Sequence, residues 1–377
     1  MSHNPGNERT AMRPVIASAL LLLALCFPAS VVAAGSVGTV RAQRDTVGFA
    51  VSREDFAKVL YAAFSAEGLD DPRARRSAET ASVVILPHDD YLYAGRTAVH
   101  ALAHLRAKRW ILFGVCHACR RIGLRDQLLL EDDAAWNVAG SDYPVDAELR
   151  DVLLERMPAG MAGVNAERHA AEHSLEAMLP WIGAAVGDFT FVPILVPGME
   201  PDRIELVAGR LAGVLAEICR ERGWAPGRDL GIVISADAVH YGCEGWGGAG
   251  YAPFGCDEAG HAAARAQDVT LAEATLAGPL TVEGIASFIR LVWNREGPEY
   301  PAEPYRITWC GLFSIPFGLT TALRLQEDLD LRPLTGTLLR YGDSVTDGRL
   351  QLEGTRLGVT APNTLGHWVG YPAVAYW

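Results

Sequence analysis

The stretch that decides the fold is residues 81–95, "ASVVILPHDDYLYAG". A continuous apolar run of this kind predicts a strand that is buried on both faces of a sheet. The run stops at Pro87, His88 and two aspartates, and a helical pattern follows. Because ligands bind beyond the carboxyl ends of strands in open α/β sheets, His88 is a candidate site residue. The alternative role for His88 is an ordinary polar turn residue.

Similar apolar runs recur along the chain and alternate with helical patterns. Further strands are predicted at 109–115, 189–196, 230–235, 334–341 and 369–376. Helices are predicted at 95–108, 173–186, 201–222, 256–276, 281–293 and 311–327. This alternation predicts an α/β fold with a mainly parallel central sheet flanked by helices. Two segments are predicted to be loops, 116–145 and the Gly-rich, aromatic stretch 241–256.

Length, composition and charge limit the classes of function. The chain has 377 residues, of which 50% are apolar, and this is enough for a sizeable core. We expect a single α/β domain over residues 45–377. The formal net charge of -12 argues against a nucleic-acid partner or an anionic membrane surface.

The N-terminus has the features of an export signal. Arg9 and Arg13 precede an apolar stretch over 15–27, which has the length of a signal-peptide core and is short for a membrane span. Small residues then lead to Ala34. We therefore expect a signal peptide over 1–34, a periplasmic location, and membrane contact through this segment alone. An uncleaved anchor is the alternative.

Ionisable side chains follow three of the predicted strands. These are His88, then His117, then Asp237 with His240. Three histidines at neighbouring strand ends can converge although they are distant in sequence. Cys310 is a fourth candidate, because it lies where a helix is predicted to begin and a helix N-terminus favours the thiolate. Taken singly, each histidine has the alternative of a hydrogen-bonded turn residue, and Cys310 that of a small core residue.

Two further histidine-containing segments differ in their expected roles. Glu172 and His173 precede an apolar helix, where they either mark the helix start or orient a metal ligand by hydrogen bonds. His100 and His104 are spaced i, i+4 on a predicted helix. This spacing suits a metal pair, but an ordinary amphipathic helix explains it as well.

Six cysteines remain after removal of residues 1–34. Cys116 and Cys119 form a C-x-x-C motif after a strand, which is typical of a thiol–disulfide exchange site in an exported protein. The alternatives are a simple disulfide between these two residues or one that joins Cys243 to Cys256.

The chain resembles the Memo family, whose bacterial members are called AmmeMemoRadiSam system protein B. Five motifs carry the resemblance in the family order over residues 80–376: "PHDDYLYAG", "GVCH", "EHSLEAMLPW", "SADAVHYG" and "CGLFSIPFG". The resemblance implies a fold similar to the class III, LigB-type extradiol dioxygenases. In those enzymes two histidines and a carboxylate hold iron(II), and a further histidine acts as base.

Carried over motif by motif, the resemblance implies a mononuclear metal site made by His88, His117 and Cys310, with cysteine at the carboxylate position. It implies His240 as the base in the pocket, with Asp237 beside it. Iron(II) is the expected metal and copper an alternative. The chain departs from the family pattern at Asp89, Asp90, Ala118 and Met178, which stand where the family has other residues.

These observations predict a metal protein of the dioxygenase type that acts on a small-molecule substrate. A metal- or partner-binding protein without turnover would use the same residues. A hydrolase with Cys310 as nucleophile and His240 as base is the third alternative. The sequence leaves the oligomeric state open.

Overall fold

The computed structural model describes residues 38–69, 77–246, 249–294 and 305–377. The predicted signal peptide, 1–34, lies outside the described residues. The described residues belong to one compact unit, Gly38–Trp377.

Most strands form one large sheet, and three short strands form a second. The small sheet has the order β1-β5-β6, with bounds Val40–Ala42, Ala135–Val138 and Ser141–Pro144. The large sheet follows the order β11-β10-β14-β2-β9-β3-β8-β4-β7, with β13 added beside β14 and β12 beside β13. Its strands in chain order are β2 Val83–Leu86, β3 Arg109–Val115, β4 Leu128–Leu130, β7 Ala162–Val164, β8 Thr190–Val196, β9 Leu230–Ser235, β10 His240–Trp246, β11 Ala249–Tyr251, β12 Gly278–Pro279, β13 Thr335–Asp343 and β14 Trp368–Tyr376.

Helices connect these strands. They are α1 Arg53–Glu67, α2 Tyr91–Leu102, α3 Ala147–Arg156, α4 Ala166–Ala170, α5 Leu179–Val186, α6 Pro201–Arg222, α7 Glu258–Leu276, α8 Val282–Val292 and α9 Ser314–Asp328. Three short 3₁₀ helices in the described residues are η1 Arg120–Ile122, η2 Glu176–Met178 and η3 Cys310–Leu312. Within the described residues, no helix combines the length and apolar character that a membrane crossing requires.

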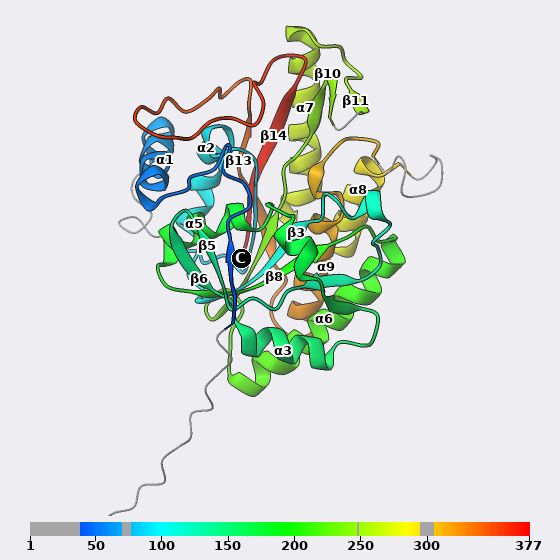
Figure 1. Ribbon diagram of the computed structural model, residues 1–377. Helices are drawn as coiled ribbons and strands as arrows, with labels where there is room; N and C mark the ends of the chain where they lie inside the picture. The colour runs from blue at the N-terminus through cyan, green and yellow to red at the C-terminus, as the bar shows by residue number, and fades with distance from the viewer. Residues whose placement is uncertain (1–37, 70–76, 247–248, 295–304) are drawn as a thin grey trace, which may run out of the picture. The chain divides into compact units, whose positions relative to one another are not determined.

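The α/β prediction is confirmed, and the central strands are parallel. β2, β9, β3 and β8 pair in parallel, whereas β14 and β4 flank them in antiparallel orientation. Alternate residues of β2 face opposite layers: Val83 and Ile85 join the core under α6 and α9, and Val84 and Leu86 join the core under α1, α2 and α5. Figure 1 shows these two helix groups on opposite sides of the sheet. Burial on both faces explains why the strands are continuously apolar.

The predicted loops are where the sequence interpretation is wrong. Segment 116–145 contains η1, β4, β5 and β6, and segment 241–256 contains β11 and most of β10. These strands are short, and several carry polar or glycine residues, so they lack the long apolar run that marks the central strands. Pairing with distant segments stabilises them: β1 pairs with β5, and β4 pairs with both β7 and β8.

Candidate metal centre

The central parallel strands deliver three candidate residues to one edge of the sheet. His88 follows β2, His117 follows β3, and Asp237 follows β9. Because β9 lies between β2 and β3 and pairs with both, the residues after these strands are neighbours. The ring centroids of His88 and His117 are 5.3 Å apart. The main chain of Cys310 is tied to the same edge, where its N–H donates to the carbonyl of Ala238 at 3.2 Å.

The imidazole of His88 is buried and held in one tautomer. The Ser235 hydroxyl donates to the carbonyl of Ser174 at 2.5 Å, so it accepts a hydrogen bond from His88 Nδ1–H at 2.9 Å. The backbone N–H of His88 donates to Asp237 Oδ1 at 2.9 Å. Nε2 of His88 is therefore the nitrogen with the lone pair, and it faces the centre.

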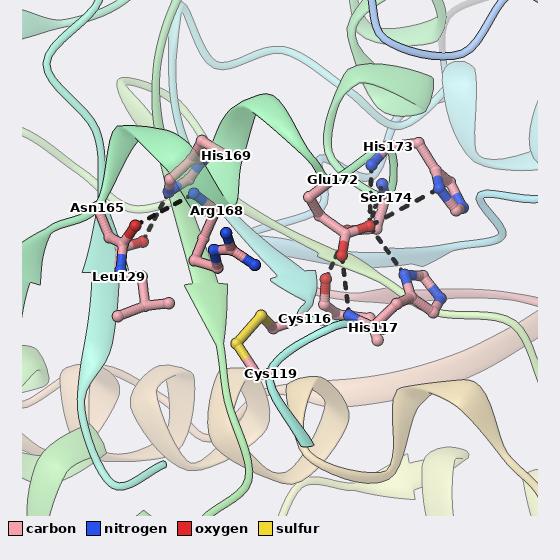
Figure 2. Close-up of a disulfide and its surroundings, with 11 residues drawn as sticks. Cys116, His117, Cys119, Leu129, Asn165, Arg168, His169, Glu172, His173 and Ser174 are labelled. Atoms are coloured by element: carbon pink, nitrogen blue, oxygen red, sulfur yellow. Dashed lines mark hydrogen bonds and ion pairs between the residues drawn. A yellow bond between two sulfur atoms is a disulfide. The ribbon is translucent and has the colours of Figure 1, made fainter. Parts of the chain in front are cut away.

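Glu172 holds His117 in the same way. Its carboxylate accepts from the backbone N–H of His117 and from Nδ1–H, both at 2.8 Å. The same carboxylate accepts from the backbone N–H groups of His173 and Ser174 at 2.9 and 3.0 Å. Figure 2 shows the rings of His117 and His173 on the same side of this carboxylate. A carboxylate on Nδ1 fixes the ring so that Nε2 can bind a metal.

The thiol of Cys310 lies between the two imidazoles. Its Sγ is 3.5 Å from His88 Nε2 and 3.3 Å from His117 Nε2. Among the described residues, two groups of ligand-type side chains have ligand atoms within 4.8 Å of one another: His88 with His117 and His173, and His88 with Asp237 and Cys310. Two imidazoles and a thiol are a donor set for iron, zinc or copper. The residues therefore fit a metal ion.

His240 and Asp237 lie beside these ligands. Asp237 Oδ2 is 3.4 Å from His88 Nε2 and 4.0 Å from His240 Nε2. Burial raises the pKa of Asp237 well above its usual value, and the nearby carboxylate of Asp89 adds to the effect. Burial lowers the pKa of His240 to about 3. His240 is thus a neutral base near the centre at pH 7.

Burial and local charges set the protonation of the other site residues. Burial lowers the pKa of His88 well below its usual value and that of His173 to about 4. Burial also opposes a charge on His117, but Glu172 and Cys310 outweigh it and raise the pKa of His117. Burial opposes ionisation of Glu172 too, yet His117 holds the pKa of that carboxyl well below its ordinary range. Burial raises the pKa of the Cys310 thiol, so metal binding must displace its proton.

The two acids that follow His88 have structural partners. Asp89 Oδ2 accepts from the Tyr371 hydroxyl at 2.5 Å. Asp90 accepts from the backbone N–H and the hydroxyl of Thr360 at 2.5 and 2.7 Å. Gly48, at φ 82°, lies against Asp90, where an added Cβ would be 1.8 Å from Oδ1. These carboxylates fix the start of α2 and the segments packed on it.

The remaining candidates have other roles. His100 pairs with Glu67 at 3.0 Å, and His104 stacks on Trp377 at a centroid distance of 5.1 Å. These two histidines therefore have separate partners away from the strand ends. Both disulfide alternatives occur, as Cys116–Cys119 and Cys243–Cys256, while Cys219 and Cys310 are free thiols.

Sequence reasoning missed two residues that act on the histidines. Ser235 is the last residue of β9, so its position at the strand end was a usable signal. Asp45 lies 3.2 Å from Nδ1 of His173 through its Oδ2. No local pattern marks Asp45, because the residues that it contacts, His173 and Glu176, are distant in the sequence.

Comparisons with known proteins identify the family of this chain. Residues 54–272 match the family of Memo-like proteins. MEMO1 family proteins from Methanothermobacter thermautotrophicus and Aeropyrum pernix are each 28% identical, over 160 and 201 residues. These alignments cover 42% and 51% of this chain, and 53% and 66% of the relatives, so the chain spans less than two thirds of their length.

An uncharacterised protein of known structure from Escherichia coli K12 is 14% identical, with a TM-score of 0.37 over 76% of this chain and 98% of its own. The match to the family covers more than half of the present chain. The resemblance seen in the five motifs is therefore confirmed, and the chain belongs to the Memo-like protein family.

Proposed function

We propose that this protein is an exported metal-dependent oxidoreductase of the dioxygenase type, with one metal ion held by His88, His117 and Cys310. The observation that carries the proposal is the convergence of two imidazole Nε2 atoms on Cys310 Sγ, at 3.5 and 3.3 Å. Iron(II) is the preferred metal, and copper is the alternative because thiolate is a soft ligand. Bound iron(II) would supply open positions for a chelating phenolic substrate and for O2.

The side chains of the protein prepare this site. Ser235 and Glu172 orient His88 and His117 through their Nδ1 atoms. His240 is neutral at pH 7 and takes a proton from a substrate hydroxyl, which is the role of a general base. Asp237, between His88 and His240, holds the backbone of His88 and lies within 4.0 Å of the base.

The two alternatives differ from this proposal in measurable ways. A hydrolase would need Cys310 as a thiolate activated by His240, yet burial raises the pKa of the Cys310 thiol. The imidazoles that contact its sulfur are those of His88 and His117. A metal-binding protein without turnover would keep the whole ligand set.

Elemental analysis of protein purified without chelators tests the metal. We expect about one metal ion per chain in the wild type and its loss in His88→Ala. The matched control is His100→Ala, which removes a histidine of α2 that pairs with Glu67 of α1. Wild-type protein that neither contains metal nor binds added iron(II) would contradict the proposal. Metal-loaded protein that consumes no oxygen with catechols would favour the alternative without turnover.

The proposed location is the periplasm, with residues 1–34 removed on export. Mass spectrometry of the protein recovered from its own host tests this. A soluble cytoplasmic form that still carries Met1 or Ser2 would refute it.

A further inference from the structure

We propose that His173 is a fourth metal-binding side chain and that Asp45 orients it, so that the centre presents three imidazoles and one thiolate. This inference rests on the proposed function and deepens it. Sequence reasoning gave His173 only a supporting role.

All three imidazoles are anchored through Nδ1. His88 donates from Nδ1 to the Ser235 hydroxyl, and His117 donates from Nδ1 to Glu172. At His173, Nδ1 lies 3.2 Å from Asp45 Oδ2 and 3.8 Å from Glu172 Oε1. Arg44 Nη1 also lies 3.4 Å from His173 Nδ1, but Asp45 Oδ2 is nearer. Two carboxylates against one more distant guanidinium favour the tautomer with the proton on Nδ1. The lone pair of His173 is therefore on Nε2, as in the other two rings.

The ring of His173 is placed to share a metal with its neighbours. It stacks on His117 with centroids 4.8 Å apart and planes at 17°, and its centroid is 5.7 Å from that of His88. One ligand atom from each of these three histidines lies within 4.8 Å of the others. Figure 2 shows His117 and His173 extending in the same direction from the Glu172 carboxylate. Because the two rings are nearly parallel and both are hydrogen-bonded at Nδ1, their Nε2 atoms can face the same metal ion.

Residues 41–45, which follow the predicted signal peptide, supply the carboxylate for this histidine. Arg44 Nη1 pairs with Asp45 Oδ1 at 2.6 Å, which leaves Oδ2 for His173. The backbone N–H of Asp45 donates to Glu176 at 2.9 Å, and Arg41 forms a buried ion pair with the same carboxylate at 2.6 Å. Asp45 is thus a positioning residue held on a fixed main chain, as a ligand-orienting carboxylate must be.

A fourth protein ligand changes what the centre can bind. A six-coordinate metal keeps two open positions, and a four-coordinate metal keeps none. Cobalt(II) distinguishes these cases without any assay of activity, because its visible absorption depends on coordination number and its near-ultraviolet charge-transfer band reports the thiolate of Cys310.

The experiment is a cobalt(II) titration of the full-length protein, with a competing chelator to measure affinity. His173→Phe keeps a ring stacked on His117 but has no Nε2. We expect cobalt(II) affinity to fall by about ten-fold or more, and the visible bands to change while the thiolate band remains. Asp45→Asn should keep the visible bands and weaken affinity by about ten-fold, the lower end of the range for a residue that orients a ligand. His100→Ala, the matched control, should behave as the wild type does.

The outcomes separate this inference from the proposed function. If the wild type binds no metal, the proposed function fails and the inference fails with it. If the wild type binds cobalt(II) and His173→Phe binds it with equal affinity and an unchanged spectrum, only the inference is overturned. If Asp45→Asn changes affinity and spectrum as much as His173→Phe does and also loses the thiolate band, the assignment of Asp45 as the residue that orients His173 is overturned.

Discussion

Replacement of Glu172 by glutamine tests how the protein holds its metal ligands. The Glu172 carboxylate accepts four hydrogen bonds, three at Oε1 and one at Oε2. Glutamine offers one acceptor oxygen and one NH2 group, with two donors, in the same space. The amide oxygen will take the Oε1 position, since this keeps three bonds, and the amide nitrogen will then face the backbone N–H of His117. One buried donor is left without an acceptor, and the bond to His117 Nδ1 becomes a neutral one.

Both losses have an expected size. A buried, unsatisfied N–H costs about 1 to 3 kcal/mol of folding free energy. The loss of the anionic partner of a metal-binding histidine weakens metal affinity by about ten- to a hundred-fold. Expressed as binding free energy, this is about 1.4 to 2.8 kcal/mol.

The assay is a metal titration of Glu172→Gln with a competing chelator, beside urea unfolding of the metal-free protein. Glu167→Gln is the matched control, because Glu167 lies on α4 close to Glu172 but its side chain is 81% exposed. The control should have wild-type affinity and stability. A folded Glu172→Gln protein with wild-type metal affinity would refute the reasoning that the carboxylate prepares His117 for a metal.

Three further predictions concern the thiols and the pH dependence of stability. Cys310→Ser should weaken metal binding by about ten-fold or more, because a neutral hydroxyl does not replace a soft anionic donor; unchanged affinity would remove Cys310 from the site. Cys116→Ser with Cys119→Ser should change affinity only modestly, because His117 is held by Glu172 and Figure 2 shows the disulfide on the far side of the main chain from its ring. Burial lowers the pKa of His169 to about 4 from 6.5. As the pH falls, His169 therefore takes up a proton in the unfolded chain before it does so in the folded protein. The free energy of unfolding decreases as a result between pH 6.5 and 4. Urea unfolding at pH 7.5 and pH 5 tests this. The decrease in unfolding free energy between these two pH values should be smaller by about 2 kcal/mol in His169→Gln than in the wild type, and an equal decrease in both proteins would contradict the prediction.

Strand ends were the part of the site that the sequence could predict. The run that ends at Leu86 is continuously apolar and buried, so the strand and the position of His88 just after it could be predicted from this run alone. The same holds for His117 after β3 and for Asp237 after β9. Parallel neighbours must bring such residues to one edge, and no knowledge of loops is needed for that step.

The residues that orient the ligands were predicted only in part. Glu172 was proposed as a ligand-orienting residue, but its partner could not be named, because the two are distant in the sequence. Glu172 meets His117 across 55 positions, and Arg41 meets Glu176 across 135. Neither contact has a period or a local motif. β1 has only three residues, and its middle residue, Arg41, is the buried one. A charged residue in a short segment indicates exposure to solvent, so the buried position of Arg41 could not be predicted without knowledge of its partner, Glu176.

The buried ion pair of Arg41 and Glu176 helps to position the main chain around Glu172. Removing two charges from water costs free energy that their attraction seldom exceeds, so such a pair is a weak source of stability and is better explained by the geometry it imposes. Here the geometry is specific: the guanidinium of Arg41 also donates to the carbonyls of His169 and Glu172, at 2.8 and 2.7 Å. It therefore fixes the main chain that carries the carboxylate of Glu172. The predicted signal peptide ends at Ala34, so removal of residues 1–34 would leave both Arg41 and Asp45 in the mature chain. Processing and metal binding are thus compatible.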